Sequence, residues 1–353
     1  MERAGRRILD VGRFDVARGE RVAIVGGNGA GKTTLLEVLA LVASPTFGVV
    51  RVGEKVAASE SERVAARRRM AYVATTPNLI DASVERNIAL PLAFRSVSMR
   101  ERRARVATAV ETAGLRVPLR QSASTLSAGE AARVSLARAF ATRPEILFLD
   151  EPFARLDEPT RVGLVREFAA MLGGLGATVV FVTHDRAEAA AIATRIVVLE
   201  AGQIAQEGDP ARLLEHPHTR AAARWAGFEN IVDGRLLEPH AGHERVEIAA
   251  GVVLDCVGKR PASEDVAACF RGESVVLAKS VDEIHGSIRN RFPARVTSVA
   301  AGQGGVTFVA IAVADGGPSI VAALTAESVQ ALGVVVGADV VAAIKAAAIH
   351  VVV

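Results

Sequence analysis

A glycine-rich segment near the start of the chain has the residues needed to hold a polyphosphate. Gly26, Gly31, Lys32 and Thr33 fit the spacing G-x-x-x-x-G-K-[ST], between an apolar run at 21–25 and a helical pattern. In such a strand–loop–helix unit, backbone N–H groups and the positive end of the helix surround phosphate oxygens. Lys32 would reach the terminal phosphates, and Thr33 would hold Mg²⁺. We therefore predict a phosphate-binding loop made of Gly26, Gly27, Asn28, Gly29, Ala30, Gly31, Lys32, Thr33 and Thr34.

Two carboxylates and an imidazole that could act on bound phosphates follow apolar runs farther along the chain. The run at 146–149 ends at Asp150 and Glu151, and the run at 178–183 ends at His184. Asp150 could hold Mg²⁺ through its water shell, and Glu151 could orient and deprotonate an attacking water. His184 could contact the terminal phosphate. A strand-end histidine can also be purely structural, but its order among the other motifs favours function.

The segment Leu126–Glu130 has two compatible interpretations. Ser127 and Glu130 form an S-x-x-E capping box at the start of a helix with an apolar face. Gly129 is not needed for a cap, because glycine weakens a first turn unless another backbone approaches closely. A capped helix end with small residues is also a good anion site, so the segment could contact phosphate as well.

The organisation of the chain favours an α/β domain followed by a small all-β domain. Apolar runs alternate with helical patterns to about residue 208, which predicts a parallel sheet, and a hairpin is expected around Pro45–Gly48. The composition changes at about 210–230. Val-rich runs with Gly-containing turns then continue from 231 to 353, with one short capped helix at 325–333.

Composition and charge exclude several classes of protein. The net charge of +3 comes without a basic stripe interleaved with aromatic residues, so no nucleic-acid partner is expected. Cys256 and Cys269 form no C-x-x-C pair, which favours buried thiols in a reducing compartment. The start of the sequence has no apolar signal segment, and no uncharged apolar run reaches a membrane-spanning length. Any membrane role would therefore require a partner.

The ordered motifs resemble those of the ATP-binding cassette (ABC) ATPases over about residues 1–230. The resemblance implies a P-loop (RecA-like) α/β ATPase domain with a helical subdomain at about 83–140. It implies a head-to-tail homodimer in which ATP and Mg²⁺ lie between the phosphate loop of one subunit and the 126–130 segment of the other. Glu151 would be the catalytic base and His184 the switch residue. The remaining residues implied to contact the nucleotide are Thr75, Ser127, Gly129, Glu130 and Asp157.

Three positions depart from the pattern of that family. Thr75 stands where a longer Gln is usual, and Ala128 replaces a glycine near the phosphate. No aromatic residue for adenine stacking lies near Arg3, although the guanidinium of Arg3 could stack instead. Phe14 lies in a strand-like pattern and is expected to belong to the core. These departures concern coupling and nucleotide affinity more than the reaction itself.

The C-terminal region carries residues that could bind a small dianion. Thr325 and Ser328 would place hydroxyls at the positive end of a helix, with Arg289 and Lys345 as cations, although plain helix capping is the alternative. Residues 285–353 resemble the molybdate-binding Mop-like (TOBE) domains, which implies an OB-like β fold. In that family such sites commonly form between subunits. The implied oxyanion ligands are Ser287, Arg289, Thr325, Ser328 and Lys345, and Ile288 replaces the usual Ala.

Together these resemblances imply the ATPase subunit of an importer for molybdate or tungstate. It would work peripherally at the cytoplasmic face of the membrane with transmembrane permease subunits, and indirectly with an extracytoplasmic substrate-binding protein. Two alternatives stay open. One is an importer ATPase for sulfate, a sugar or a polyamine, and the other is an oxyanion-binding sensor whose ATPase is weak.

Overall fold

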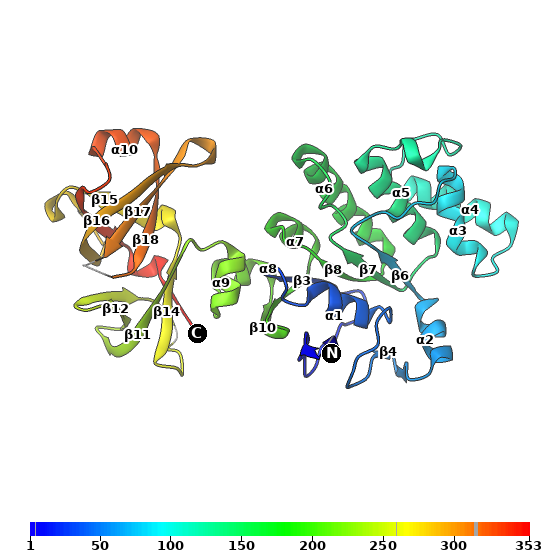
Figure 1. Ribbon diagram of the computed structural model, residues 1–353, viewed down its shortest axis with the longest axis horizontal. Helices are drawn as coiled ribbons and strands as arrows, with labels where there is room; N and C mark the ends of the chain where they lie inside the picture. The colour runs from blue at the N-terminus through cyan, green and yellow to red at the C-terminus, as the bar shows by residue number, and fades with distance from the viewer. Residues whose placement is uncertain (4, 259, 314–316) are drawn as a thin grey trace. The chain divides into compact units, whose positions relative to one another are not determined.

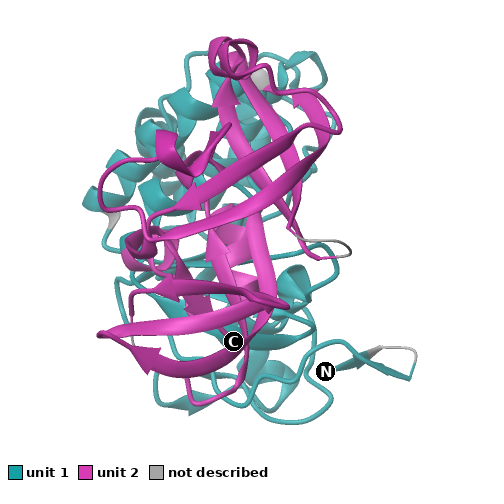
Figure 2. Cartoon of the chain, turned by 90° about the vertical axis from the view of Figure 1, so that its left-hand side faces the viewer, with its two compact units in different colours: residues 1–211 teal, residues 212–353 magenta. Residues whose placement is uncertain are grey.

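The computed structural model describes residues 1–3, 5–258, 260–313 and 317–353, with the side chains of Arg3, Leu175 and Gln303 left out. The chain forms two compact units, residues 1–211 and 212–353, which Figure 2 draws in teal and magenta. Within the described residues, no helix is both long enough and apolar enough to cross a membrane.

The first unit is built on a six-stranded sheet with the strand order β10-β9-β3-β8-β7-β6. Five strands are parallel, and β10 is antiparallel to β9. The central strands are buried along nearly their whole length, as expected for a parallel sheet covered on both faces. The strands are β3 (Arg21–Gly26), β6 (Met70–Val73), β7 (Ile146–Asp150), β8 (Thr178–Val182), β9 (Arg195–Glu200) and β10 (Gln203–Gly208).

Most helices of this unit begin at a Ser or Asp whose side chain accepts a hydrogen bond from the N–H three residues on. The helices α3, α4 and α5 lie together beyond β6 in Figure 1. The helices are α1 (Lys32–Leu39), α2 (Glu60–Arg67), α3 (Val84–Ala93), α4 (Met99–Thr112), α5 (Ala128–Ala141), α6 (Glu158–Leu175) and α7 (Arg186–Ile192), and α8 (Pro210–Glu215) spans the division between the units.

Two local expectations for the first unit are wrong. The hairpin lies at β4 (Arg51–Val52) and β5 (Lys55–Val56), around Gly53 rather than around Pro45–Gly48, because the positive φ of Gly53 forms the turn there. Phe14 does not lie in a strand. It packs at the edge of the core, with the guanidinium of Arg195 5.9 Å from the centre of its ring.

The second unit contains two antiparallel five-stranded sheets around one shared apolar core, as predicted for an all-β domain. The first sheet has the order β13-β12-β11-β14-β20, and the second has the order β15-β19-β16-β17-β18. The strands are β11 (Asn230–His240), β12 (His243–Ala249), β13 (Val252–Cys256), β14 (Asp265–Phe270), β15 (Val275–Ala278), β16 (Asn290–Ala301), β17 (Val306–Val313), β18 (Ser319–Thr325), β19 (Asp339–Ile344) and β20 (His350–Val352).

Two buried asparagines connect the two sheets. The side chain of Asn230 exchanges two hydrogen bonds with the backbone of Val321, and that of Asn290 does the same with Asp255. The four distances lie between 2.7 and 2.9 Å. Each amide thus satisfies a backbone N–H and a backbone C=O that would otherwise be unpaired inside the domain.

Two helices complete the second unit. The helix α9 (Arg220–Ala226) packs its buried alanines against Phe228, Cys269 and Val352, so residues before the boundary expected at 230 belong to this unit. The helix α10 (Ala326–Leu332) begins at the predicted cap Thr325 and ends at Gly333, whose φ of 65° forms a left-handed C-cap.

Candidate functional site

The predicted phosphate loop lies at the carboxyl end of β3, between the strand and α1. Gly26 and Gly31 have φ values of 143° and 98°, which favour glycine. A Cβ on Gly26 would lie 2.1 Å from the backbone O of Leu199, so no side chain fits there. The helix α1 has no side-chain cap at its start. Its first N–H groups are therefore available to an anion.

Lys32 lies across the phosphate loop and is almost completely buried. Its Nζ donates hydrogen bonds to the backbone O atoms of Gly26 and Gly27, at 3.0 and 2.9 Å. Burial lowers the pKa of Lys32, and the nearby carboxylates of Glu151 and Asp150 act in the opposite direction. The ammonium is thus held beside the loop by weak neutral acceptors, which phosphate oxygens can replace.

Asp150 at the end of β7 forms the centre of a small oxygen cluster. Its carboxylate accepts hydrogen bonds from Thr33 Oγ1 at 3.1 Å and from the hydroxyl of Tyr72 at 3.3 Å. The residue is only 7% exposed, and burial raises its pKa. A buried carboxylate whose two donors are neutral hydroxyls favours a nearby cation.

This oxygen cluster fits Mg²⁺. Magnesium takes oxygen ligands and is usually bound by one or two carboxylates together with substrate phosphates. Thr33 and Asp150 supply a hydroxyl and a carboxylate beside the phosphate loop. In the described part of the chain, no cluster of three or more His, Cys, Asp or Glu residues could hold a metal ion.

Glu151 and His184 lie close together, although 33 positions separate them in sequence. His184 Nδ1 is 3.5 Å from Glu151 Oε2, and the imidazole is 58% exposed. Glu151 has a φ of 45°, an unfavourable value for a residue with a side chain, and its N–H donates to the backbone O of Val182 at 3.0 Å. With this strained backbone conformation, the side chain of Glu151, the predicted base, lies beside the imidazole of His184 at the carboxyl ends of the strands.

Hydrogen bonds and an ion pair hold the loop that carries His184 in place. Thr183 Oγ1 donates a 2.5 Å hydrogen bond to the buried carboxylate of Glu188, and it accepts one from the N–H of Asp185 at 3.0 Å. Asp185 also forms an ion pair with Arg161 at 3.2 Å. Burial raises the pKa of Glu188, and the bond from Thr183 opposes this. These contacts fix the backbone on both sides of the imidazole.

The segment Ser127–Glu130 forms the predicted capping box, in which Ser127 Oγ accepts from the N–H of Glu130 and Glu130 bonds back. The structure also explains Gly129, because a Cβ there would lie 3.1 Å from Thr160 Cγ2. Thr160 in turn donates from N and Oγ1 to the cap residue Asp157, at 3.0 and 2.9 Å. Gly129 therefore allows close packing between the starts of α5 and α6.

Within one copy of the chain, the capping-box segment and the phosphate loop are not joined. No hydrogen bond or ion pair in the described residues links Ser127, Gly129 or Glu130 to residues 26–34. Thr75 follows β6 and is half-buried, and no described hydrogen bond joins it to Asp150 or Glu151. The side chain of Arg3, suggested for adenine stacking, lies outside the described residues.

The five predicted oxyanion residues fall into two groups at opposite ends of one sheet. In the antiparallel pairing of β16 with β19, Asn290 lies opposite Ile344, so Arg289, which precedes β16, and Lys345, which follows β19, lie at the same end of the strands. Thr325 pairs with Val306, beside the other end of β16, and its Oγ1 lies 2.8 Å from Ser328 Oγ. The twelve residues of β16 span roughly 35 Å, so one chain does not bring the groups together.

Three sets of contacts in and near the candidate site were not predicted from the sequence. Tyr72 donates to Asp150, and Thr183 donates to Glu188. Arg138 donates to the backbone O atoms of Pro77 and Asn78, at 2.7 and 3.0 Å. A signal for Tyr72 existed, because it is the chain's single tyrosine and lies near the end of an apolar run. The contact of Tyr72 with Asp150 depends on the pairing of β6 with β7, which cannot be read from the sequence.

Comparison with known proteins agrees with this geometry. The profile described as ABC transporter matches residues 9–154, and the profile described as TOBE domain matches residues 286–351. A molybdate/tungstate import ATP-binding protein (WtpC) of Pyrococcus horikoshii is 34% identical over 96% of this chain and 94% of its own length. An Fe(3+) ions import ATP-binding protein (FbpC) of Streptomyces coelicolor is 39% identical over 66% of each chain.

A solved structure supports the same fold for the first unit. It is the dimeric post-hydrolysis state of the ATP-binding cassette MJ0796 bound to ADP and Pi, with a TM-score of 0.51 and 31% identity. The match covers 56% of this chain and 88% of that chain. From the phosphate loop, the strand-end carboxylates and a relative similar along nearly the whole length, the chain belongs to the ABC transporter family, as the ATP-binding ATPase subunit of an importer with a C-terminal TOBE domain.

Proposed function

We propose that this chain hydrolyses ATP with Mg²⁺ to drive the import of molybdate or tungstate. The observation that carries the choice of cargo is the extent of similarity. The molybdate/tungstate relative is similar along 96% of the chain, which includes the TOBE region, whereas the Fe(3+) relative is similar along 66%. The cations Arg289 and Lys345 in that region add chemical support, because a tetrahedral dianion prefers such partners.

In the proposed reaction, the phosphate loop and Lys32 bind the phosphates of ATP. Thr33 and Asp150 would hold Mg²⁺, which neutralises the charge that develops on the transferred phosphoryl group. Glu151 accepts a proton from the attacking water, and His184 contacts the terminal phosphate. The 3.5 Å approach of His184 to Glu151 supports these roles, since both side chains reach the same strand ends as Asp150.

The active form is proposed to be a homodimer. Among the described residues, no hydrogen bond or ion pair joins Ser127, Gly129 or Glu130 to the phosphate loop of their own chain, and we propose that a second copy supplies them to the nucleotide. The dimeric solved relative supports this arrangement. The ATPase would act at the cytoplasmic face of the membrane, peripherally on transmembrane permease subunits, and an extracytoplasmic substrate-binding protein would deliver the anion to that permease.

The base assignment is tested with Glu151→Gln, which keeps the shape of the side chain and removes its basicity. ATP turnover should fall by roughly 10²- to 10⁴-fold, while binding of ATP is retained. The matched control is Glu111→Gln, an exposed carboxylate at the end of α4, which should leave turnover unchanged. Wild-type turnover in Glu151→Gln would show that another group accepts the proton.

The cargo is tested by calorimetry of the full chain with molybdate, tungstate and sulfate. We expect binding of the first two at a site formed between two copies, with Ser287, Arg289 and Lys345 of one copy facing Thr325 and Ser328 of the other. Arg289→Ala and Lys345→Ala should abolish most of the heat. Lys279→Ala is the control, because Lys279 follows β15 at the opposite end of β19.

The outcomes of this calorimetry separate the alternatives. Binding heat with sulfate alone would identify sulfate as the cargo and would keep the proposed binding site. Heat with none of the three anions would end the oxyanion proposal without affecting the ATPase assignment. Binding of molybdate by a protein that lacks measurable ATP turnover would instead favour an oxyanion sensor.

A further inference from the structure

A large cavity in the first unit lies at the amino ends of the strands, whereas the phosphate loop lies at their carboxyl ends. Its volume is about 550 Å³, within the range of 300 to 1,000 Å³ that is usual for small-molecule sites. Met70, Ile146 and Thr178, the first residues of β6, β7 and β8, line it. At the other ends of these strands, Asp150 is the last residue of β7 and His184 follows β8. None of the proposed nucleotide or oxyanion residues lines this cavity.

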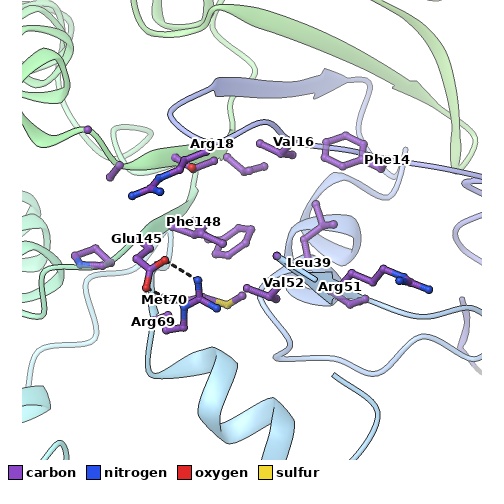
Figure 3. Close-up of a pocket in the computed structure, with 18 residues that line it drawn as sticks. Phe14, Val16, Arg18, Leu39, Arg51, Val52, Arg69, Met70, Glu145 and Phe148 are labelled. Carbon is purple, nitrogen blue, oxygen red and sulfur yellow. Dashed lines mark hydrogen bonds and ion pairs between the residues drawn. The ribbon is translucent and has the colours of Figure 1, made fainter. Parts of the chain in front are cut away.

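The floor of the cavity is apolar. It is formed by Leu39 from the last turn of α1, Val52 from β4, Met70, Phe148 from β7 and Val180 from β8. All but Leu39 are buried, so the floor is a fixed part of the core and does not have to form when a ligand arrives. Figure 3 shows the ring of Phe148 between Arg18 on one side and Leu39 with Val52 on the other.

The rim of the cavity has more positive than negative charge. Its charged residues are Arg18, Arg51, Arg69 and Glu145. Arg69 and Glu145 neutralise each other through two hydrogen bonds of 2.8 and 2.6 Å. That leaves Arg18, whose guanidinium lies on the side of the cavity where Glu145 lies, while the side chain of Arg51 extends from the far end (Figure 3).

Arg18 is available to a ligand. It is exposed, and in the part of the chain that the structure describes it forms no hydrogen bond or ion pair. Its charge nevertheless acts in the cavity: the hydrogen bonds from Arg69 lower the pKa of Glu145, and the charge of Arg18 acts in the same direction. A planar guanidinium at the edge of an apolar wall is suited to a carboxylate or sulfonate whose organic part rests on that wall.

We propose that this cavity binds a small organic anion with an apolar body, such as an aryl or alkyl carboxylate or sulfonate. The anionic group pairs with Arg18, and the apolar body lies on Phe148, Met70 and Val52. Inorganic anions do not fit this description, because they would leave the floor of the cavity empty. The site is independent of ATP hydrolysis and of the proposed cargo, since it shares no residue with either.

The probe for this site is 8-anilinonaphthalene-1-sulfonate, an aromatic anion whose fluorescence rises in apolar surroundings. The full-length protein is titrated with saturating ADP present, so that the nucleotide site is occupied. We expect saturable binding to one site. Arg18→Glu should weaken it about tenfold, because a charge-assisted contact is replaced by repulsion. The control Arg103→Glu, on the exposed surface of α4, should change affinity by less than about twofold.

A neutral analogue of the probe separates charge from folding. N-phenyl-1-naphthylamine has the same aromatic body without the sulfonate, so its affinity should be equal in the wild type and in Arg18→Glu. The proposal is overturned if the sulfonate binds both proteins equally, if ADP displaces it, or if no saturable binding occurs. Loss of the neutral analogue in Arg18→Glu would also overturn it, because the cavity would then have collapsed for reasons other than charge.

Discussion

The hydroxyl of Tyr72 should set how tightly the oxygen cluster at Asp150 holds Mg²⁺. Tyr72→Phe keeps the ring in its half-buried position and removes one hydrogen-bond donor to Asp150. Burial raises the pKa of Asp150, while the bonds from Thr33 and Tyr72 lower it. Without the Tyr72 donor the carboxylate is harder to ionise, and a protonated carboxyl group is a poor ligand for Mg²⁺.

The size of the effect follows from the length of the bond. A typical intramolecular hydrogen bond contributes about 0.5 to 1.5 kcal/mol, which corresponds to about a 2- to 12-fold change in a binding constant. The distance of 3.3 Å is longer than the usual range for O–H···O bonds, so the lower part of that interval applies. We therefore expect the Mg²⁺ concentration for half-maximal activity to rise about two- to fivefold.

The assay is ATP turnover as a function of Mg²⁺ at fixed ATP and at several pH values. The difference in the Mg²⁺ requirement between Tyr72→Phe and the wild type should grow as the pH falls. The pKa of Asp150 is higher in Tyr72→Phe, so protons begin to compete with Mg²⁺ at a higher pH. The control is Thr108→Val, which removes an exposed hydroxyl on α4 that donates to the backbone O of Ala104. An unchanged Mg²⁺ dependence in Tyr72→Phe, or an equal change in the control, would refute the reasoning.

Three further perturbations test other parts of the structure. Ser127→Ala and Ser98→Ala each remove a cap with a 3.3 Å hydrogen bond and should lower the free energy of unfolding by about 1 kcal/mol. Only Ser127→Ala should also slow ATP turnover, and equal turnover in both variants would remove Ser127 from the nucleotide site. Glu188→Gln should gain stability relative to the wild type as the pH rises from about 4 to 7. Burial raises the pKa of Glu188 in the folded protein, so the wild type loses stability as the pH rises through that pKa, whereas the uncharged Gln does not. A difference in urea unfolding that does not depend on pH would contradict this. Gly163→Ala, whose new methyl group meets nothing within 4 Å, should raise the free energy of unfolding by about 0.5 to 1 kcal/mol. Gly129→Ala should not, because its methyl group would lie 3.1 Å from a side chain of α6, and an equal gain would mean that α5 and α6 separate easily.

The parts of the site that depend on local chemistry could be predicted from the sequence. The phosphate loop needs glycines at positive φ followed by a lysine and a hydroxyl, and all of these are consecutive in Gly26–Thr33. The cap residues Ser127 and Thr325 are likewise specified by residues within one helical turn. Such features need no knowledge of which strands are neighbours.

Contacts between distant segments could not be predicted in the same way. The hydrogen bond from Tyr72 to Asp150 depends on the pairing of β6 with β7, and the approach of Gly129 to Thr160 depends on how α5 crosses α6. Strand order is a global property, because apolar runs such as 70–73 and 178–182 fit several positions in a parallel sheet equally well. The separation of Arg289 from Thr325 was hidden for the same reason.

The strand exchange in the second unit has a consequence for how this unit folds. The strand β20 completes the sheet of β11 to β14, although about 80 residues separate it from β14, and β15 leaves for the other sheet in between. Pairings of this kind raise the contact order, so we expect the unit to fold slowly and in one cooperative step. During synthesis, the edge of β14 would stay unpaired until residues 350–352 emerge from the ribosome. In that interval the exposed edge of β14 is the place where chaperones would bind or where two nascent chains would pair incorrectly.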